Sequence, residues 1–198
     1  MRRLGAAVVA ILTLAASVAS GASIARLTLS GPPGEPITNG RSYDLVFQQP
    51  DDNVTGLVRS SLAGGEPALL QFHLSSGATP GLFADLFFGT DTLNLPMQPG
   101  FYPNALETPP GTLGHPGFLI ALEGRGPNDQ TGQFTVEDVA FAADGTIRRF
   151  VVDLVQQAYP SIPLSASGRL VYLPEPAGLL SIIVACLPIA WRRHRVRC

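Results

Sequence analysis

The stretch of sequence that points most directly to a fold class is GQFTVEDVAFAADGTIRRFVVDLVQQ, residues 132–157. Two runs rich in Val, Phe, Thr and Ile flank the dipeptide Asp144-Gly145, which favours the tight turn of a β-hairpin. Apolar side chains alternate with polar ones in both runs, at Phe134, Val136, Phe150, Val152 and Leu154. The alternation predicts a pair of strands with one buried face. Short helices are an alternative for both runs, but the flanking turn residues and the β-branched side chains favour strands.

Seven further strand-like runs occur along the chain, at 25–30, 42–48, 55–62, 68–75, 82–89, 117–124 and 168–173. Turn-forming segments separate them, and the chain contains 21 Gly and 18 Pro. GFYPNA (100–105) has the composition of such a turn. Many short strands at close spacing predict an all-β fold. We expect a single antiparallel β-sandwich of jelly-roll-like type over residues 23–173.

The charges of the chain are segregated. It has no Lys, and its 13 basic residues are all Arg, of which two lie near the N-terminus and four near the C-terminus. Seven Arg and 15 acidic residues give residues 24–175 a formal charge of −8. Because nucleic-acid binding needs a basic surface on the folded domain, we expect no nucleic-acid partner.

Residues 1–22 have the pattern of a secretory signal peptide. Arg2 and Arg3 precede an uncharged apolar run from Leu4 to Val18, and small residues follow. This order of a charged region, an apolar region and a small-residue cleavage site predicts export and cleavage after Ala22, with cleavage after Ala19 as an alternative.

The C-terminal residues 174–198 combine a short apolar segment with a cluster of arginines. Residues 177–191 carry no charge and would form a transmembrane helix of about 22 Å, shorter than a bilayer core of about 30 Å. Arginines beyond such a segment stay on the cytoplasmic side of a membrane. Burial of the segment inside the domain would leave the arginines without a role, so we expect a membrane segment.

This tail resembles the PEP-CTERM protein-sorting signal of Gram-negative bacteria that make exopolysaccharide. The matching residues are Pro174, Glu175, Pro176, Arg192, Arg193 and Arg195. The resemblance implies recognition by an exosortase, after export by the secretion machinery. It also implies transient anchoring in the inner membrane, followed by release to the cell surface or the extracellular matrix.

The central region is similar to a bacterial extracellular β-domain of unknown function. The similarity rests on GEPITNG (34–40), PGFYPNA (99–105), residues 124–157 and GRLVY (168–172). It implies a fold and no activity. Cys186 and Cys198 both lie in the C-terminal tail, so the domain has no disulfide or thiolate metal site available.

The sequence contains no recognisable catalytic motif. No G-x-S-x-G, H-E-x-x-H or P-loop pattern occurs, and His73 and His115 have no metal-ligand spacing. Five acidic residues lie in strand-like runs and are candidates for a glycosidase pair or for the solvent face of a sheet: Asp85, Glu123, Glu137, Asp138 and Asp153. We expect a non-enzymatic structural or adhesive component of the cell surface or exopolysaccharide matrix. A glycan-active enzyme is a further alternative.

A second alternative is a carbohydrate- or calcium-binding module. Two loops gather oxygen ligands suited to calcium, the candidates being Asp51, Asp52, Asn128 and Asp129. We expect no other cofactor. Tyr102 is the candidate aromatic platform for exopolysaccharide, although packing of its ring against the core is the alternative.

Overall fold

The computed structural model describes residues 22–109, 111–126, 129–158 and 164–174. The predicted signal peptide and all of the predicted sorting tail except Pro174 lie outside these residues. Ten strands and one short 3-10 helix, η1 (Asp91–Leu93), form the described chain. The strands are β1 (Ser23–Ser30), β2 (Ser42–Gln48), β3 (Asn53–Ser61), β4 (Pro67–Ser75), β5 (Phe83–Gly89), β6 (Gly100–Glu107), β7 (Gly117–Leu122), β8 (Gln130–Phe141), β9 (Ile147–Ala158) and β10 (Ser165–Pro174).

The hairpin predicted from residues 132–157 is confirmed. β8 and β9, of 12 residues each, pair antiparallel on either side of Asp144-Gly145. Gly145 has a φ of 83°, a conformation that glycine adopts without steric strain, and the backbone N–H of Ala142 donates to the carbonyl of Thr146 over 2.8 Å. The alternating apolar residues are almost completely buried, and they form the centre of the core: Phe134, Val136, Phe150, Val152 and Leu154.

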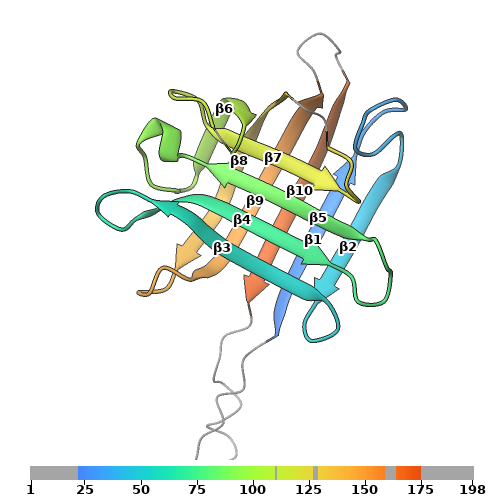
Figure 1. Ribbon diagram of the computed structural model, residues 1–198, viewed down its shortest axis with the longest axis horizontal. Coiled ribbons are helices and arrows are strands. Elements are labelled where there is room, and N and C mark those ends of the chain that lie inside the picture. Colours follow the sequence, from blue (N-terminus) through green and yellow to red (C-terminus); the bar gives the residue numbers. More distant parts are fainter. Residues whose placement is uncertain (1–21, 110, 127–128, 159–163, 175–198) are drawn as a thin grey trace, which may run out of the picture. The chain divides into compact units, whose positions relative to one another are not determined.

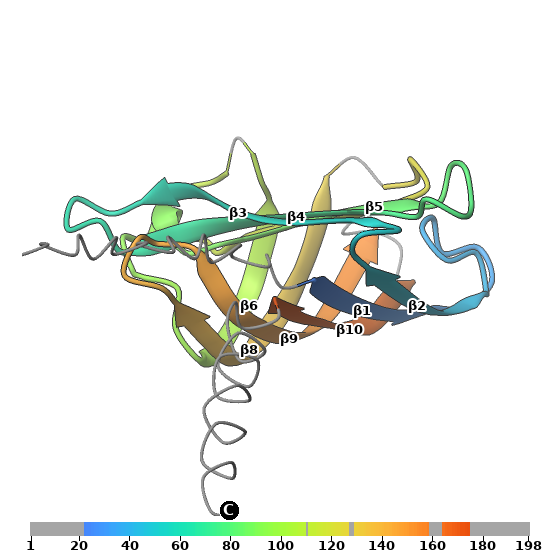
Figure 2. The ribbon, with the colours of Figure 1, turned by 90° about the horizontal axis from the view of Figure 1, so that it is seen from below.

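Hydrogen bonds join all ten strands into one sheet with the order β2-β1-β10-β9-β8-β6-β7-β5-β4-β3. Neighbouring strands are antiparallel except β6 and β7, which pair parallel at Leu106–Gly117 and Glu107–Phe118. The sheet folds over into two layers (Figures 1 and 2), with β3, β4, β5 and β7 crossing the strands of the other layer. The predicted all-β, mainly antiparallel domain is confirmed. In place of the two separate sheets of a jelly-roll-like sandwich, one continuous sheet forms both layers.

The continuity of the sheet depends on the junction between β6, β7 and β8. The N–H of Leu106 donates to the carbonyl of Pro116 over 2.9 Å, which ties β6 to the start of β7. Farther along β7, the buried side chain of Gln130 on β8 bonds to the backbone of Ile120. Its Oε1 accepts from the N–H over 2.9 Å, and its Nε2 donates to the carbonyl over 3.0 Å. The amide side chain thus takes the place of a neighbouring strand, and the backbone groups of Ile120 remain satisfied.

β6 is a strand that the sequence did not reveal, because Pro103-Asn104 gives GFYPNA the composition of a turn. The register with β8 shifts between Tyr102 and Ala105, and Asn104 has a φ of 53°. Since proline cannot donate a ladder hydrogen bond, it is tolerated in a strand at such a bulge. The two residues of the expected turn therefore form a bulge within a strand.

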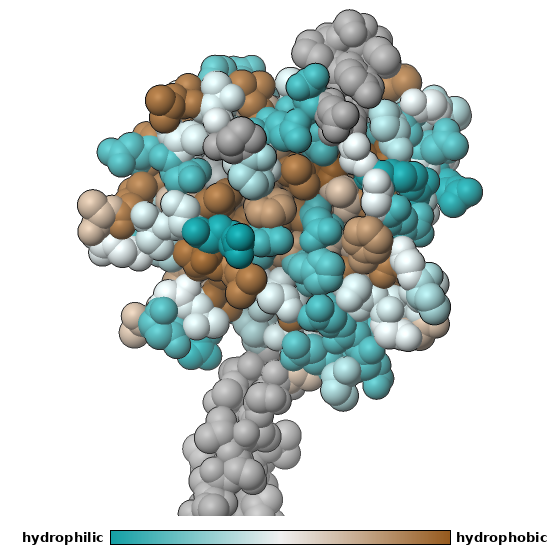
Figure 3. Space-filling view, in the orientation of Figure 1, coloured by the Kyte–Doolittle hydropathy of each residue, from teal (hydrophilic) through white to brown (hydrophobic). Residues whose placement is uncertain are grey.

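Aromatic rings from both layers meet in the core. Phe72 of β4 stacks on Phe150 of β9, with ring centroids 5.1 Å apart. Phe88 of β5 lies 5.3 Å from Phe134 and 5.4 Å from Phe150. In contrast to this aromatic core, the outer face of the layer formed by β3, β4, β5 and β7 has polar and apolar residues interspersed (Figure 3). The aromatic contacts are therefore the main packing link between the two layers.

We predict that Phe88→Ala destabilises the protein by about 3–5 kcal/mol, because it leaves a cavity among rings of both layers. Phe101→Ala is the matched control, since that ring is 58% exposed, and it should change stability by less than about 0.5 kcal/mol. Urea unfolding of the full-length chain in mild detergent measures both values. Equal effects of the two substitutions would contradict this packing.

Candidate functional site

The first predicted calcium loop is held together by the side chain that was expected to bind the ion. Oδ2 of Asp52 accepts the N–H of Gln48 over 2.9 Å, and Oδ1 accepts the N–H of Gly77 over 2.9 Å. These two backbone hydrogen bonds lower the pKa of the Asp52 carboxyl. Asp51 is exposed. Asp52 thus connects the β2–β3 turn to the β4–β5 loop.

The second predicted calcium loop connects β7 to β8. The N–H of Asp129 donates to Oε2 of Glu107 over 2.8 Å, and Asn128 lies outside the described residues. Asp52 and Asp129 bond to different residues, since Asp52 accepts from Gln48 and Gly77 and Asp129 donates to Glu107. Among the described residues, no three His, Cys, Asp or Glu side chains come together as a metal site.

The predicted aromatic platform, Tyr102, is a core residue. Its ring is 7% exposed and stacks on Phe134 with centroids 4.9 Å apart, while its hydroxyl donates to the carbonyl of Gln98 over 2.9 Å. Burial raises the pKa of this hydroxyl. The neighbouring ring of Phe101 points the opposite way because successive strand residues face opposite sides, and it is the exposed ring of this segment.

The acidic residues of the strands form separate ion pairs. Asp85 lies 2.7 Å from Nδ1 of His73, Asp153 accepts from Arg169 over 2.8 and 2.9 Å, and Glu123 and Asp138 pair with Arg125 and Arg149. Glu137 is exposed. Asp85 and Glu123 belong to the β5–β7 region, whereas Asp153 lies on the outer face of the other layer. The structure therefore does not bring Asp85, Glu123 and Asp153 into one cleft.

The carboxylate of Glu35 is fully buried, but it is bonded within its own loop. It accepts the N–H of Thr38 over 2.6 Å, the hydroxyl of Thr38 over 2.7 Å and the N–H of Ile37 over 3.1 Å. These bonds fix the connection between β1 and β2. Glu35 therefore has a structural role that does not extend beyond the loop.

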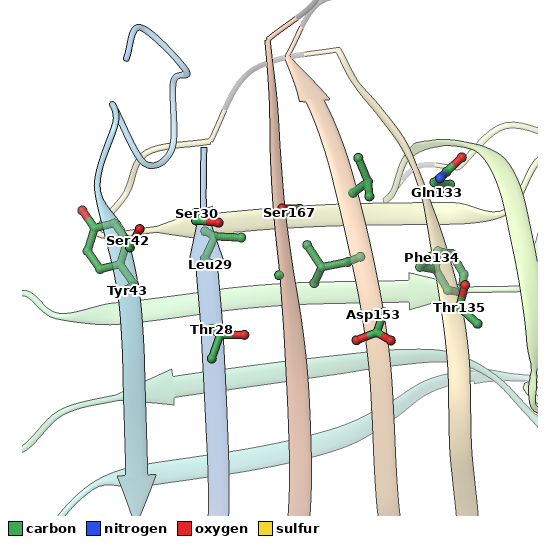
Figure 4. Close-up of a pocket in the computed structure, with 13 residues that line it drawn as sticks. Thr28, Leu29, Ser30, Ser42, Tyr43, Gln133, Phe134, Thr135, Asp153 and Ser167 are labelled. Carbon is green, nitrogen blue, oxygen red and sulfur yellow. The ribbon is translucent and has the colours of Figure 1, made fainter. Parts of the chain in front are cut away.

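A polar groove lies on the outer face of the layer that contains β2, β1, β10, β9 and β8 (Figure 4). A cavity of about 570 Å³ crosses β2, β1, β10, β9 and β8. The strand register aligns its hydroxyl and amide side chains in rows across the strands. They are Thr28, Ser30, Ser42, Gln133, Thr135 and Ser167.

Two further cavities extend this groove. One of about 390 Å³ shares Gln133 and Val155 with the first, and it adds Asn104 of β6 and His115 of the β6–β7 loop. Another of about 460 Å³ shares Leu106 with the second and ends at Glu107 and Asp129. We call the three cavities together the polar groove. The sequence alone did not reveal it, because its residues come from strands far apart in the chain.

The residues of the predicted sorting motif are largely outside the described chain. Pro174 is the last residue of β10 and pairs with Ser23, the first residue of β1. Glu175, Pro176, Arg192, Arg193 and Arg195 lie outside the described residues. Within residues 22–174, as far as they are described, no helix has the length and hydrophobicity needed to span a bilayer.

We predict that Asp52→Asn lowers the melting temperature at pH 7 by about 3 °C, since the Asn side chain can accept only one of the two backbone hydrogen bonds, a loss of about 1 kcal/mol. A carboxyl with a lowered folded pKa stabilises the fold above its unfolded pKa of about 4 and loses that effect as the pH falls. The difference from the unmodified chain should therefore shrink below pH 4. Asp51→Asn is the control and should have no effect at either pH. A constant difference down to pH 2 would contradict the assignment.

Comparisons of this chain with models of protein families, with curated proteins and with solved structures find no match.

Proposed function

We propose that the protein is an exported component of the cell surface or exopolysaccharide matrix, sorted by its C-terminal tail. The observation that carries this proposal is the position of the domain between the two predicted signals. All ten described strands lie between Ser23 and Pro174, and these two residues pair with each other. Removal of residues 1–22 and of residues 175–198 would therefore leave every described strand in place, as a protein processed at both ends requires.

The role proposed for the exported domain is structural or adhesive and non-enzymatic. The separate ion pairs of Asp85, Asp153 and Glu123 support this role, because a glycosidase needs two carboxyl groups facing one substrate bond. The exosortase, the secretion machinery and, transiently, the inner membrane are the partners that this route requires. The acidic composition of the domain argues against nucleic acid.

The polar groove favours binding over a purely structural role. A sandwich-like β domain with a long concave surface can bind a matrix component and retain it without catalysing a reaction. Carbohydrate binding is therefore the second candidate function, and it is compatible with the sorting proposal.

The sorting proposal predicts that the protein released from the native cells lacks its tail. Mass spectrometry should detect peptides of the domain and no peptide beyond Pro176. Glu175→Ala, which removes the charge of the Pro-Glu-Pro motif, should leave the protein in the membrane fraction with its tail intact.

Glu137→Ala is the matched control for this experiment. Glu137 is an exposed carboxylate of β8, so its loss should leave release and processing unchanged. Released protein that still ends at Cys198 would refute the sorting proposal. Normal processing of Glu175→Ala would refute the role of the motif.

A further inference from the structure

The polar groove runs across the strands instead of along them. It passes over β2, β1, β10, β9, β8 and β6, a distance of about 24 Å at the usual strand spacing of about 4.8 Å. The floor consists of strands whose backbone groups pair within the sheet. A peptide that binds by adding a strand would lie along β2, the edge strand of the sheet, and not across the strands. The groove therefore fits an extended chain that is recognised through side chains.

The side chains of the groove are mostly uncharged hydrogen-bonding groups. Hydroxyls line the part over β1, β2 and β10, at Thr28, Ser30, Ser42 and Ser167. Amides and hydroxyls line the part over β6, β8 and β9, at Asn104, Thr131, Gln133, Thr135 and Gln157. Each of these groups both donates and accepts hydrogen bonds. A ligand with many hydroxyls can form hydrogen bonds with these groups, whereas an apolar ligand would leave their donors and acceptors without partners.

The charges at the groove select against a polyanion. Asp153 lies in the groove and is paired with Arg169 over 2.8 Å. Glu107 and Asp129 add negative charge at one end, and His115 is the one ring nitrogen base among the residues lining the three cavities. Unpaired arginines, the usual partners of phosphate, sulfate and carboxylate groups, are not among these lining residues. A neutral ligand is therefore favoured.

An exposed aromatic ring lies beside the groove. Phe101 of β6 pairs with Thr135 of β8, which lines the first cavity, and the ring is 58% exposed. An aromatic face attracts the apolar C–H face of a sugar ring while the sugar hydroxyls bond to neighbouring polar groups. Phe101 thus has the role of an aromatic platform for a sugar, which the sequence analysis suggested for Tyr102.

We propose that the polar groove binds a neutral polysaccharide that crosses the strands from β2 to β6, with one sugar stacked on Phe101. This inference rests on the proposed adhesive role and names its ligand class. It is independent of the sorting route, because binding is measured on the isolated protein and processing is measured in cells.

The test is affinity electrophoresis of the full-length chain in mild detergent, in gels containing one polysaccharide each. Dextran, amylose, soluble cellulose ether and galactomannan are the neutral probes, and alginate and dextran sulfate are the charged probes. The proposal predicts retardation by at least one neutral probe and none by the charged probes. Retardation by a charged probe alone, or by no probe, would overturn it.

Substitutions locate the site on the groove. Gln133→Ala combined with Thr135→Ala removes two hydrogen-bonding side chains and should weaken binding about tenfold or more. Phe101→Ala should weaken it by a similar factor, and Ser167→Tyr should block the centre of the groove. Gln71→Ala, in β4 of the opposite layer, and Thr55→Ala, in β3, are the matched controls and should bind normally.

The substituted residues lie outside the buried core, so each variant should keep the melting temperature of the unmodified chain. This measurement shows that the fold is retained. Binding that survives all three groove variants would overturn the assignment even if a neutral polysaccharide is retained. Loss of binding in Gln71→Ala with a normal melting temperature would do the same, because it would place the ligand on the other layer. If a neutral polysaccharide is bound while the released protein still ends at Cys198, only the sorting proposal fails.

Discussion

The packing of aromatic rings between the two layers is the interaction on which the rest of the structure depends. Phe72 and Phe88 extend from one layer, and Phe134 and Phe150 extend from the other. Rings of this size bury large apolar areas and prefer the stacked and edge-on geometries observed here. Because the domain contains no cysteine, this core must supply its stability without disulfides. It also fixes which side chains face outward, and therefore where a ligand can bind.

The fold-over at β6, β7 and β8 determines the form of the outer surface. Gln130 bonds to Ile120 where β7 diverges from the strands of the other layer, so the backbone groups of Ile120 stay paired while one sheet forms both layers. The six strands on one side of this junction form a broad surface of regular structure. Binding residues on strands are held more rigidly than residues on loops, so the polar groove presents its hydroxyls and amides in fixed positions.

The sequence predicted the local parts of this fold well. Alternating apolar residues and Asp144-Gly145 were sufficient for the β8–β9 hairpin, and the other seven strand-like runs all correspond to strands, namely β1 to β5, β7 and β10. The strand β6 was missed because Pro103 and Asn104 act as a bulge only when β8 lies alongside. Which of the two rings, Tyr102 or Phe101, is exposed likewise depends on which face of β6 turns inward. That face is set by the pairing of β6 with the distant strand β8.

The groove and the ion pairs were beyond prediction for the same reason. Ser42, Ser30 and Ser167 are ordinary polar residues in the sequence, and they become one row only when β2, β1 and β10 pair in register. Arg169 and Asp153 are 16 residues apart and meet across two strands. The predicted sorting signals are the opposite case, since their prediction uses linear patterns of charge, hydrophobicity and proline that need no tertiary contacts.

The central claim is that the polar groove is the binding surface of the domain. The most direct measurement is an NMR titration of the isotope-labelled full-length chain in detergent, with linear oligosaccharides cut from a neutral polysaccharide. A polysaccharide bound in the groove should change the shifts only of the outward-facing residues of β2, β1, β10, β9 and β8 and of Phe101. Changes centred on β3, β4 and β5, or no changes with any neutral oligosaccharide, would contradict it.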